Sequence, residues 1–338
     1  MIKKRLNKNV FSMFKKYNSS YICFDENKQN LKKFCNIKNI ELRKNVHTNK
    51  TEIFIDDKVL LTNRKNVFSL KSEDLCLLIK LEILRNKSNM DVLKTPITLC
   101  VNNLIDFINL KEQNLLPKNY DNKYDNKGDH FNYHNYINNN KKERILYFFE
   151  KERTLMEKKI YENFINDLIF YINNNEEHAF NMHKNSLHDI KKTIHLPNCL
   201  NYINKYHINN LYEEQKYIYN KFINLFERIH NIKLNTANHF ETPEQNFDVQ
   251  EKIQKLIKNM NNSEIFLFYK CTQYLNSFIF TYLFLNRYIN YKDVYRYCNL
   301  EYIYQFFKWG YVYDVNIMKD ANTLLMLSTL RLINKMIT

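Results

Sequence analysis

Histidine and cysteine are the side chains of this 338-residue chain that could hold a metal ion or act as nucleophiles. His178, His183 and His188 recur every five residues, about 140° apart on a helix, so they do not share the face that ligands at i and i+4 share. His130 and His134 have that spacing but lie in a stretch rich in Asn and Tyr. The sequence therefore predicts no metal site.

The cysteines are odd in number and scattered, and no two of them form a Cys-x-x-Cys pair; they are Cys23, Cys35, Cys76, Cys100, Cys199, Cys271 and Cys298. This distribution suits a reducing compartment and predicts neither a disulfide framework nor a zinc site. No Ser/His/Asp or Cys/His arrangement emerges from the spacing. We therefore expect no catalytic residues, no cofactor and no enzymatic activity.

Only two residues of the chain are glycine. Phosphate-binding loops, dinucleotide-binding fingerprints and nucleophile elbows need glycine where the backbone has a positive φ or touches a ligand. The composition therefore excludes these sites. The 53 asparagines, like the abundant Lys, Ile and Tyr, are typical of an AT-rich genome, and we attach no functional meaning to them.

The net charge of +15 is concentrated in part at the N-terminus. Residues 1–24 carry six basic side chains and no acid, interspersed with Leu, Val, Phe and Met, which resembles an organellar presequence. A disordered basic arm is the alternative interpretation. Without these six charges the chain keeps a net charge of +9.

Aromatic residues are abundant, with 25 Tyr and 24 Phe. Together with the basic surplus they allow an organellar RNA-binding protein, in which bases stack on exposed rings. The alternative is that the rings fill helix cores, which fits their helical spacing in 264–309 at Phe266, Tyr269, Tyr274, Phe278, Tyr282, Tyr295 and Tyr304. We favour core packing and keep RNA binding as the alternative function.

The elements begin with short strands over residues 50–70, where Ile53 and Ile55 alternate with polar neighbours and a tight turn is expected at Asp57-Lys58. Ser72 and the two acids after it predict a helix start. Glu82 falls on the apolar stripe of that helix. Its carboxylate is therefore either buried with a partner or faces a groove.

Helical patterns dominate the rest of the chain, and the expected helices are 143–172, 211–230, 248–260, 264–287, 291–309 and 316–336. The apolar stretch Ile265 to Leu285 contains Lys, Gln and Asn, so it predicts a buried helix and not a membrane span. The fold class is therefore α+β, with a small β-containing N-terminal domain followed by a larger helical domain.

Segment 291–314, YKDVYRYCNLEYIYQFFKWGYVYD, is the most informative. If it forms one helix, a largely polar stripe lies between two apolar faces and consists of Val294, Cys298, Glu301, Gln305 and Lys308. Gly310 is expected to end the helix in a left-handed conformation. Spacing alone fits a satisfied interior seam and a functional surface equally well.

This segment resembles the signature of the chaperones that assemble the F₁ part of ATP synthase in mitochondria and α-proteobacteria (the ATP synthase F₁ complex assembly factor 2 family). The family pattern is Leu-Glu, an aromatic-Gln pair and Lys-Trp-Gly, matched here by Leu300-Glu301, Tyr304-Gln305 and Lys308-Trp309-Gly310.

Two further motifs precede it in the first hundred residues. The run Ile55 to Thr62 is similar to Leu-Asp-x-Arg-x-Leu-Lys-Thr-Pro but has Asn63 in place of proline. Ser72 to Arg85 is similar to a family helix that ends in Glu-Trp, with Glu82 matching the glutamate and Ile83 replacing the tryptophan.

Three more motifs lie between that helix and segment 291–314, in the family's order. Ile97-Thr98, Asn102 and Asp106 fit the next motif closely. Asp167 and Tyr171 fit Asp-x-x-x-Tyr-Arg without its arginine, and Leu211 and Gln215 fit Leu-x-x-x-Gln, with Tyr219 in place of a tryptophan. The resemblance covers roughly residues 45–338.

The resemblance implies a non-enzymatic chaperone of the mitochondrial matrix that binds the unassembled α subunit of ATP synthase. Because acids on otherwise apolar helical faces need a reason, we hypothesise that Glu301, Gln305 and Trp309 lie at or beside the partner-binding site, with Glu82 and Asp167 as supporting acids. The expected organisation is a presequence at 1–24, a β-containing domain at 45–110, a low-complexity insert at 111–142 and a helical domain at 143–338 with a polar insert at 172–209.

Overall fold

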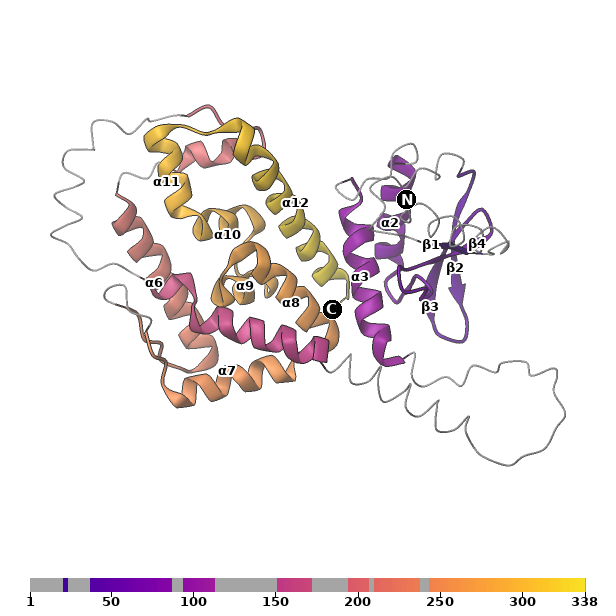
Figure 1. The fold of residues 1–338 in the computed structure, drawn as a ribbon, viewed down its shortest axis with the longest axis horizontal. Coiled ribbons are helices and arrows are strands. Elements are labelled where there is room, and N and C mark those ends of the chain that lie inside the picture. Colours follow the sequence, from indigo (N-terminus) through magenta and orange to yellow (C-terminus); the bar gives the residue numbers. More distant parts are fainter. Residues whose placement is uncertain are drawn as a thin grey trace, which may run out of the picture. The chain divides into compact units, whose positions relative to one another are not determined.

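The computed structural model describes residues 21–23, 37–86, 94–112, 151–171, 194–206, 210–237 and 243–337. The chain divides into two compact units, Met1–Asn109 and Leu110–Thr338. The first unit contains a sheet and two helices, whereas the second is helical in its described part (Figure 1). The α+β class and the order of its parts are therefore as the sequence predicts.

The sheet has five strands, β1 (Tyr21–Cys23), β2 (Ile40–Asn45), β3 (Lys50–Ile55), β4 (Lys58–Leu61) and β5 (Ser69–Leu70). The strand order is β1-β4-β3-β2, with β5 also paired to β3. All pairs are antiparallel except β1 with β4. Along β3, Ile53 and Ile55 are buried and alternate with partly exposed residues, as the period of a strand requires.

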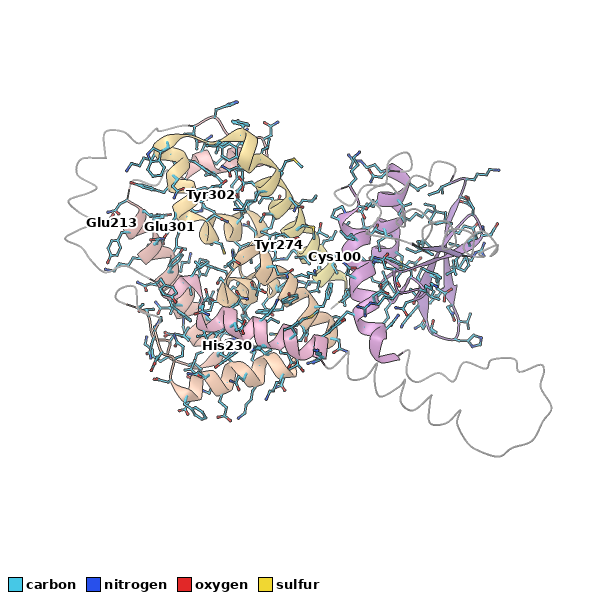
Figure 2. The ribbon with its side chains drawn as sticks, in the orientation of Figure 1. Cys100, Glu213, His230, Tyr274, Glu301 and Tyr302 are labelled. Atoms are coloured by element: carbon cyan, nitrogen blue, oxygen red, sulfur yellow. The ribbon has the colours of Figure 1, made fainter. Side chains whose placement is uncertain are left out.

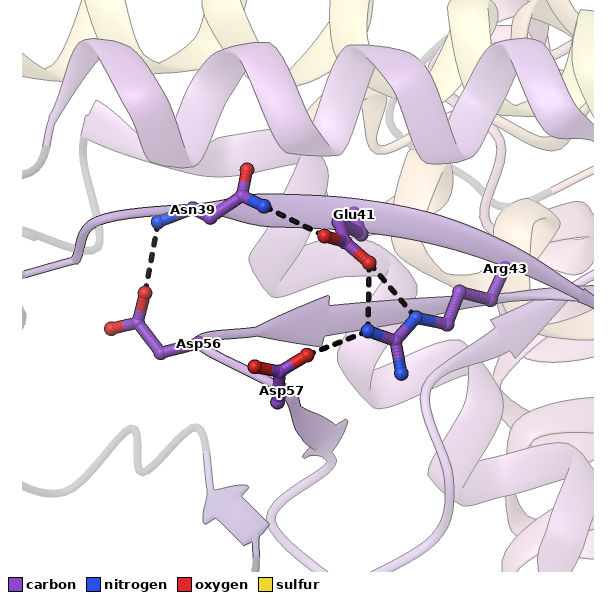
Figure 3. Close-up of polar contacts among 5 residues, drawn as sticks. All are labelled: Asn39, Glu41, Arg43, Asp56 and Asp57. Carbon is purple, nitrogen blue, oxygen red and sulfur yellow. Dashed lines mark hydrogen bonds and ion pairs between the residues drawn. The ribbon is translucent and has the colours of Figure 1, made fainter.

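The turn between β3 and β4 is formed by Asp56 and Asp57, one residue earlier than the sequence predicts. Both residues have positive φ, 46° and 64°, as a two-residue hairpin turn of the primed type requires. The Asp56 Oδ1 atom accepts hydrogen bonds from the backbone N–H groups of Lys38 and Asn39, at 2.9 and 2.8 Å. Figure 3 shows that this turn thereby holds the start of β2, a strand that the sequence analysis missed.

Two helices complete the first unit, α2 (Glu73–Arg85) and α3 (Pro96–Glu112). The predicted start of α2 is confirmed, because the Ser72 side chain accepts a hydrogen bond from the Leu75 backbone N–H. Leu75, Ile79 and Ile83 are fully buried on the face of α2 that contacts the sheet.

The second unit opens with a helix over residues 151–165 and continues through two short 3₁₀ helices, η2 (Leu168–Phe170) and η3 (Asn201–Lys205). The helices that follow are α6 (Leu211–His230), α7 (Phe247–Asn259), α8 (Asn262–Leu275), α9 (Phe278–Leu285), α10 (Tyr291–Cys298), α11 (Leu300–Trp309) and α12 (Tyr313–Ile337). In the described part of this unit no residues form a β-strand.

Three of the expected long helices are shorter than predicted. The first ends at residue 165, the segment 264–287 is divided at Asn276 and Ser277, and the segment 291–309 is divided at Asn299. Asn276 takes the left-handed conformation that normally needs glycine, and the Ser277 side chain caps α9. In a chain with two glycines, asparagine takes over this role, and Asn231 ends α6 in the same way.

The core of the second unit is built around α9, whose sequence FIFTYLFL is buried at all positions except Tyr282. The Phe278 ring lies in the middle of an aromatic cluster, with ring centroids 5.0 Å from Phe268, 5.4 Å from Phe164 and 6.2 Å from Phe226. The contacts with Phe164 and Phe226 are edge-on, and such contacts add to the free energy gained from burying apolar area.

Several predictions fall on segments outside the described residues. These are most of the presequence and the low-complexity insert, part of the polar insert, and the five candidate histidines. Among the helices that the structure does describe, none is both long enough and apolar enough to cross a bilayer.

Candidate functional site

The exposed face of α11 carries three of the predicted partner-binding residues. Glu301, Gln305 and Trp309 recur every four residues, so they lie along one side of the helix, and all three are exposed. Trp309 has 68% of its surface in solvent, which is unusual for the largest apolar side chain. We call these three residues the α11 stripe.

The predicted continuous stripe from Val294 to Lys308 is wrong, because Asn299 divides it between two helices. Asn299 has φ −122° and ψ 29°, outside helical geometry, so the helical phase does not continue from α10 into α11. Val294 is fully buried. The polar positions after the break, Glu301 and Gln305, stay together because they belong to the same helix.

Glu301 connects the α11 stripe to α6. Its Oε1 atom accepts a hydrogen bond of 3.2 Å from the Gln215 Nε2 atom, 86 residues earlier in the chain. Figure 2 shows Glu301 of α11 beside Glu213 of α6, on neighbouring helices. Two motifs of the resemblance, Leu-x-x-x-Gln and Leu-Glu, therefore meet at this surface.

The C-terminal end of the α11 stripe is apolar. Trp309 is followed by Val312, which is 57% exposed, and the Lys308 Nζ atom lies 5.2 Å from the centre of the Trp309 ring. Gly310 ends the helix, as predicted, but with φ 93° and ψ 167° in place of the left-handed helical conformation. That region is essentially restricted to glycine.

Glu82 is half-buried, and its carboxylate lies at the N-terminus of α3. It accepts hydrogen bonds from the backbone N–H of Ile97 at 3.1 Å and from the backbone N–H and hydroxyl of Thr98 at 2.7 and 2.6 Å. Burial raises the pKa of this carboxyl, although the bonds from Thr98 and Ile97 oppose the change. Of the two expected possibilities, the structure has the carboxylate with partners, in a half-buried position.

Asp167 is fully buried, and its carboxylate accepts hydrogen bonds at the start of two elements. Its carboxylate accepts from the backbone N–H of Ile169 in η2 at 3.2 Å and from that of Ile279 in α9 at 2.8 Å. Burial raises its pKa to about 6, against the lowering effect of bonds from Ile279, Ser277 and Ile169. Because it has no exposed surface, Asp167 can act on a partner only through the elements that it holds.

The motifs of the first unit also meet in pairs. The Asp106 carboxylate of α3 accepts from the Thr62 hydroxyl, from Asn66 Nδ2 at 2.7 Å and from the Arg64 backbone N–H at 3.1 Å. Asn102 Oδ1 accepts from the Asn63 backbone N–H at 3.2 Å. Asn102 and Asp106, the motif residues of α3, therefore hold the loop that follows β4. The motif Ile55 to Thr62 ends in this loop.

In the described residues no three His, Cys, Asp or Glu side chains gather as a metal site. The interpretation of the aromatic residues as core is confirmed for Phe266, Phe278, Tyr295 and Tyr304, which are at most 7% exposed. These rings are not available to stack on nucleic-acid bases.

Sequence reasoning missed the buried acid of α12, Asp320, and the exposed apolar residues that follow the stripe, Val312 and Met318. Asp320 directly follows Lys319, and the apolar residues of α12 recur with only a weak helical periodicity. No sequence signal therefore marked Asp320 as buried. The exposure of Val312 and Met318 follows from packing, which spacing does not reveal.

Comparison with known proteins identifies solved structures with a similar fold. No protein-family profile and no curated protein sequence matches the chain. Among solved structures, Atp12 from Paracoccus denitrificans superposes with a TM-score of 0.60 at 12% identity, over 90% of this chain and 97% of that one. The Atu1473 protein of Agrobacterium tumefaciens, described as a candidate chaperone, gives a TM-score of 0.62 at 12% identity over 90% and 86%.

Atp12 belongs to the assembly-chaperone family that the motifs resemble, so the fold that this resemblance implies is confirmed. At this identity the likeness establishes a common fold. The chain is thus an α+β protein with the fold of the assembly chaperones, and the particular fold is that of Atp12.

Proposed function

We propose that this protein is a non-enzymatic chaperone that holds the unassembled α subunit of ATP synthase until the F₁ head is assembled. The observation that carries the proposal is the shared fold with Atp12, which extends over 90% of this chain and 97% of the Paracoccus protein. The contacts between motif residues support it, because Gln215 with Glu301 and Glu82 with Thr98 join different motifs of the family.

The client-binding surface in this proposal is the α11 stripe. A subunit interface exposed before assembly is a large apolar patch and an aggregation hazard. Trp309 and Val312 offer apolar area to such a patch, while Glu301 and Gln305 supply a polar rim that favours correctly charged partners. Asp167 supports this surface indirectly, by holding the start of α9 in the same unit, whereas Glu82 holds the start of α3 in the first unit.

The proposed location is the mitochondrial matrix, reached by means of the basic N-terminal segment. Tyr21–Cys23 forms β1 and pairs in parallel with β4, so it is part of the folded sheet. The targeting segment in this proposal therefore ends before Tyr21.

The test is co-expression of residues 21–338 with the cognate ATP synthase α subunit, followed by affinity capture. We expect the α subunit to be soluble and captured, and to be released when the β subunit is added. The β subunit alone should not be captured. Failure of the folded protein to capture the α subunit contradicts the proposal, and RNA binding that weakens steeply with salt would favour the alternative function.

Two variants refine the test. Glu301→Lys reverses the charge at the polar rim and removes the acceptor for Gln215, so we expect client capture to fall while the melting temperature changes little. Glu251→Lys is the matched control, because it reverses an exposed acid on α7. Equal capture by both variants would remove Glu301 from the site.

A further inference from the structure

The buried acid Asp320 in α12 connects three parts of the chain around the proposed client surface. It is 2% exposed, and its Oδ2 atom accepts a hydrogen bond of 2.8 Å from the Tyr311 hydroxyl and one of 3.4 Å from the Tyr302 hydroxyl. Tyr302 lies in α11, and Tyr311 lies between Gly310 and the start of α12.

The two tyrosines that bind Asp320 lie next to the two ends of the α11 stripe. Tyr302 directly follows Glu301, the first residue of the α11 stripe, and Tyr311 comes two residues after Trp309, the last. One carboxyl oxygen therefore anchors the chain next to both ends of the stripe. The intervening Gly310 is the position at which the backbone changes direction.

Aromatic packing reinforces the same arrangement. Ring centroids are 4.2 Å apart between Tyr302 and Phe306, 4.9 Å between Phe306 and Tyr311, and 5.1 Å between Tyr311 and Tyr313. These rings follow one side of α11 and the turn after it, whereas Glu301, Gln305 and Trp309 are exposed on another.

The polar partners of Asp320 are neutral hydroxyls. In the described part of the chain no ion pair joins Asp320 to a Lys, Arg or His side chain. Burying a carboxyl group without a cation is unfavourable, and an apolar side chain of similar size often gives a more stable core. A buried polar group of this kind is better explained by the geometry that it specifies than by a gain in stability.

We propose that Asp320 is a positioning residue that sets the orientation of the α11 stripe for client binding. This inference rests on the proposed function. Asp320 is buried and makes no contact with the client. It acts by holding Tyr302 and Tyr311, and through them the rotation of α11 about its axis and the direction of Trp309.

The chain contains a single tryptophan, Trp309, so its fluorescence reports on the stripe alone. The experiment compares the unmodified protein with Asp320→Leu, Asp320→Asn and Tyr311→Phe. For each, Trp309 anisotropy and client capture are measured, with far-UV circular dichroism as a check on folding. Thr329→Val is the matched control, because Thr329 is a buried polar residue on the same helix, 4% exposed.

Asp320→Leu should lower the Trp309 anisotropy and weaken client capture about tenfold, as expected if only a tenth of the molecules keep the competent orientation. Asp320→Asn retains an acceptor oxygen at the same place and should behave like the unmodified protein. Thr329→Val should leave both signals unchanged even if it lowers the melting temperature. Tyr311→Phe removes one hydroxyl only and serves where Asp320→Leu does not fold.

The outcomes separate the two proposals. If the unmodified protein captures the client, and a folded Asp320→Leu or Tyr311→Phe variant has unchanged anisotropy and unchanged capture, the positioning role is overturned and the proposed function stands. If the unmodified protein captures no client, the proposed function fails, and with it a role of Asp320 in client binding. A loss of anisotropy equal in Asp320→Leu and Thr329→Val would show general loosening and would also overturn the inference.

Discussion

The Asp167 carboxylate accepts a hydrogen bond of 2.8 Å from the backbone N–H of Ile279, at the N-terminus of the buried helix α9 and 112 residues away in sequence. The opposite end of α9 is held by basic and amide side chains of α12. Arg331 donates to the carbonyls of Phe284 and Ile289, and Asn334 donates to that of Leu285. An acid at the N-terminus and a cation at the C-terminus complement the helix dipole.

The raised pKa of Asp167, about 6, makes the stability of the second unit depend on pH. The unfolded carboxyl titrates near 3.8, so between pH 4 and 6 the folded state binds the additional proton and stability falls as pH rises. Relative to Asp167→Asn, the unmodified protein should gain about 1 kcal/mol of unfolding free energy between pH 7.5 and 5. Urea titrations of both proteins at several pH values measure this difference, and a constant difference would contradict it.

Removing the Glu82 carboxylate should loosen the start of α3, whose first turn contains no acid of its own. Glu82→Ala deprives the Ile97 and Thr98 backbone N–H groups of an acceptor, at a cost of about 1–2 kcal/mol. Glu82→Gln should cost less because one oxygen remains. Hydrogen exchange at Ile97 and Thr98 is the direct measurement, and Arg85→Ala, an exposed change on α2, should leave it unaffected.

Gly310→Ala should destabilise the second unit, because φ 93° with ψ 167° places a Cβ atom in a strained conformation. The expected cost is about 1–3 kcal/mol, visible as a lower melting temperature. Met318→Ala, at an exposed position on α12, is the control and should have little effect. An unchanged melting temperature in Gly310→Ala would mean that the turn after α11 relaxes freely.

Asn276 should tolerate glycine better than alanine. Its φ of 50° and ψ of 29° are left-handed helical values, which glycine reaches freely and alanine only at a cost of about 1 kcal/mol or more. Chemical denaturation of Asn276→Gly and Asn276→Ala checks this order. Similar stabilities for the two variants would show that the left-handed conformation at this position does not limit stability.

The sequence predicts the class of the fold and several element starts because those signals are local. Ser72 at the start of α2 and the alternation around Ile53 are examples, and α6 has the predicted bounds. The break at Asn276 was missed because asparagine there takes the left-handed conformation that glycine usually takes, and the break at Asn299 carries neither glycine nor proline to mark it. In a chain with two glycines, asparagines such as Asn231 and Asn276 carry part of the signal for helix ends.

The candidate site was only partly predictable for a similar reason. Spacing put Glu301 and Gln305 on the polar stripe of α11 but not Trp309, whereas in the structure all three are exposed. Spacing could not distinguish an acid that faces solvent from one such as Asp167 that caps a distant helix. The partners of these acids, Thr98, Ile279 and Gln215, lie 16, 112 and 86 residues away.

The way in which α9 is held also fixes when the second unit can finish folding. The helix is only eight residues long, too short to persist alone, and its two ends depend on Asp167 and on Arg331 and Asn334. All three residues act from outside the helix, and Arg331 and Asn334 belong to α12. During synthesis, the core of this unit must therefore wait until the residues of α12 have emerged.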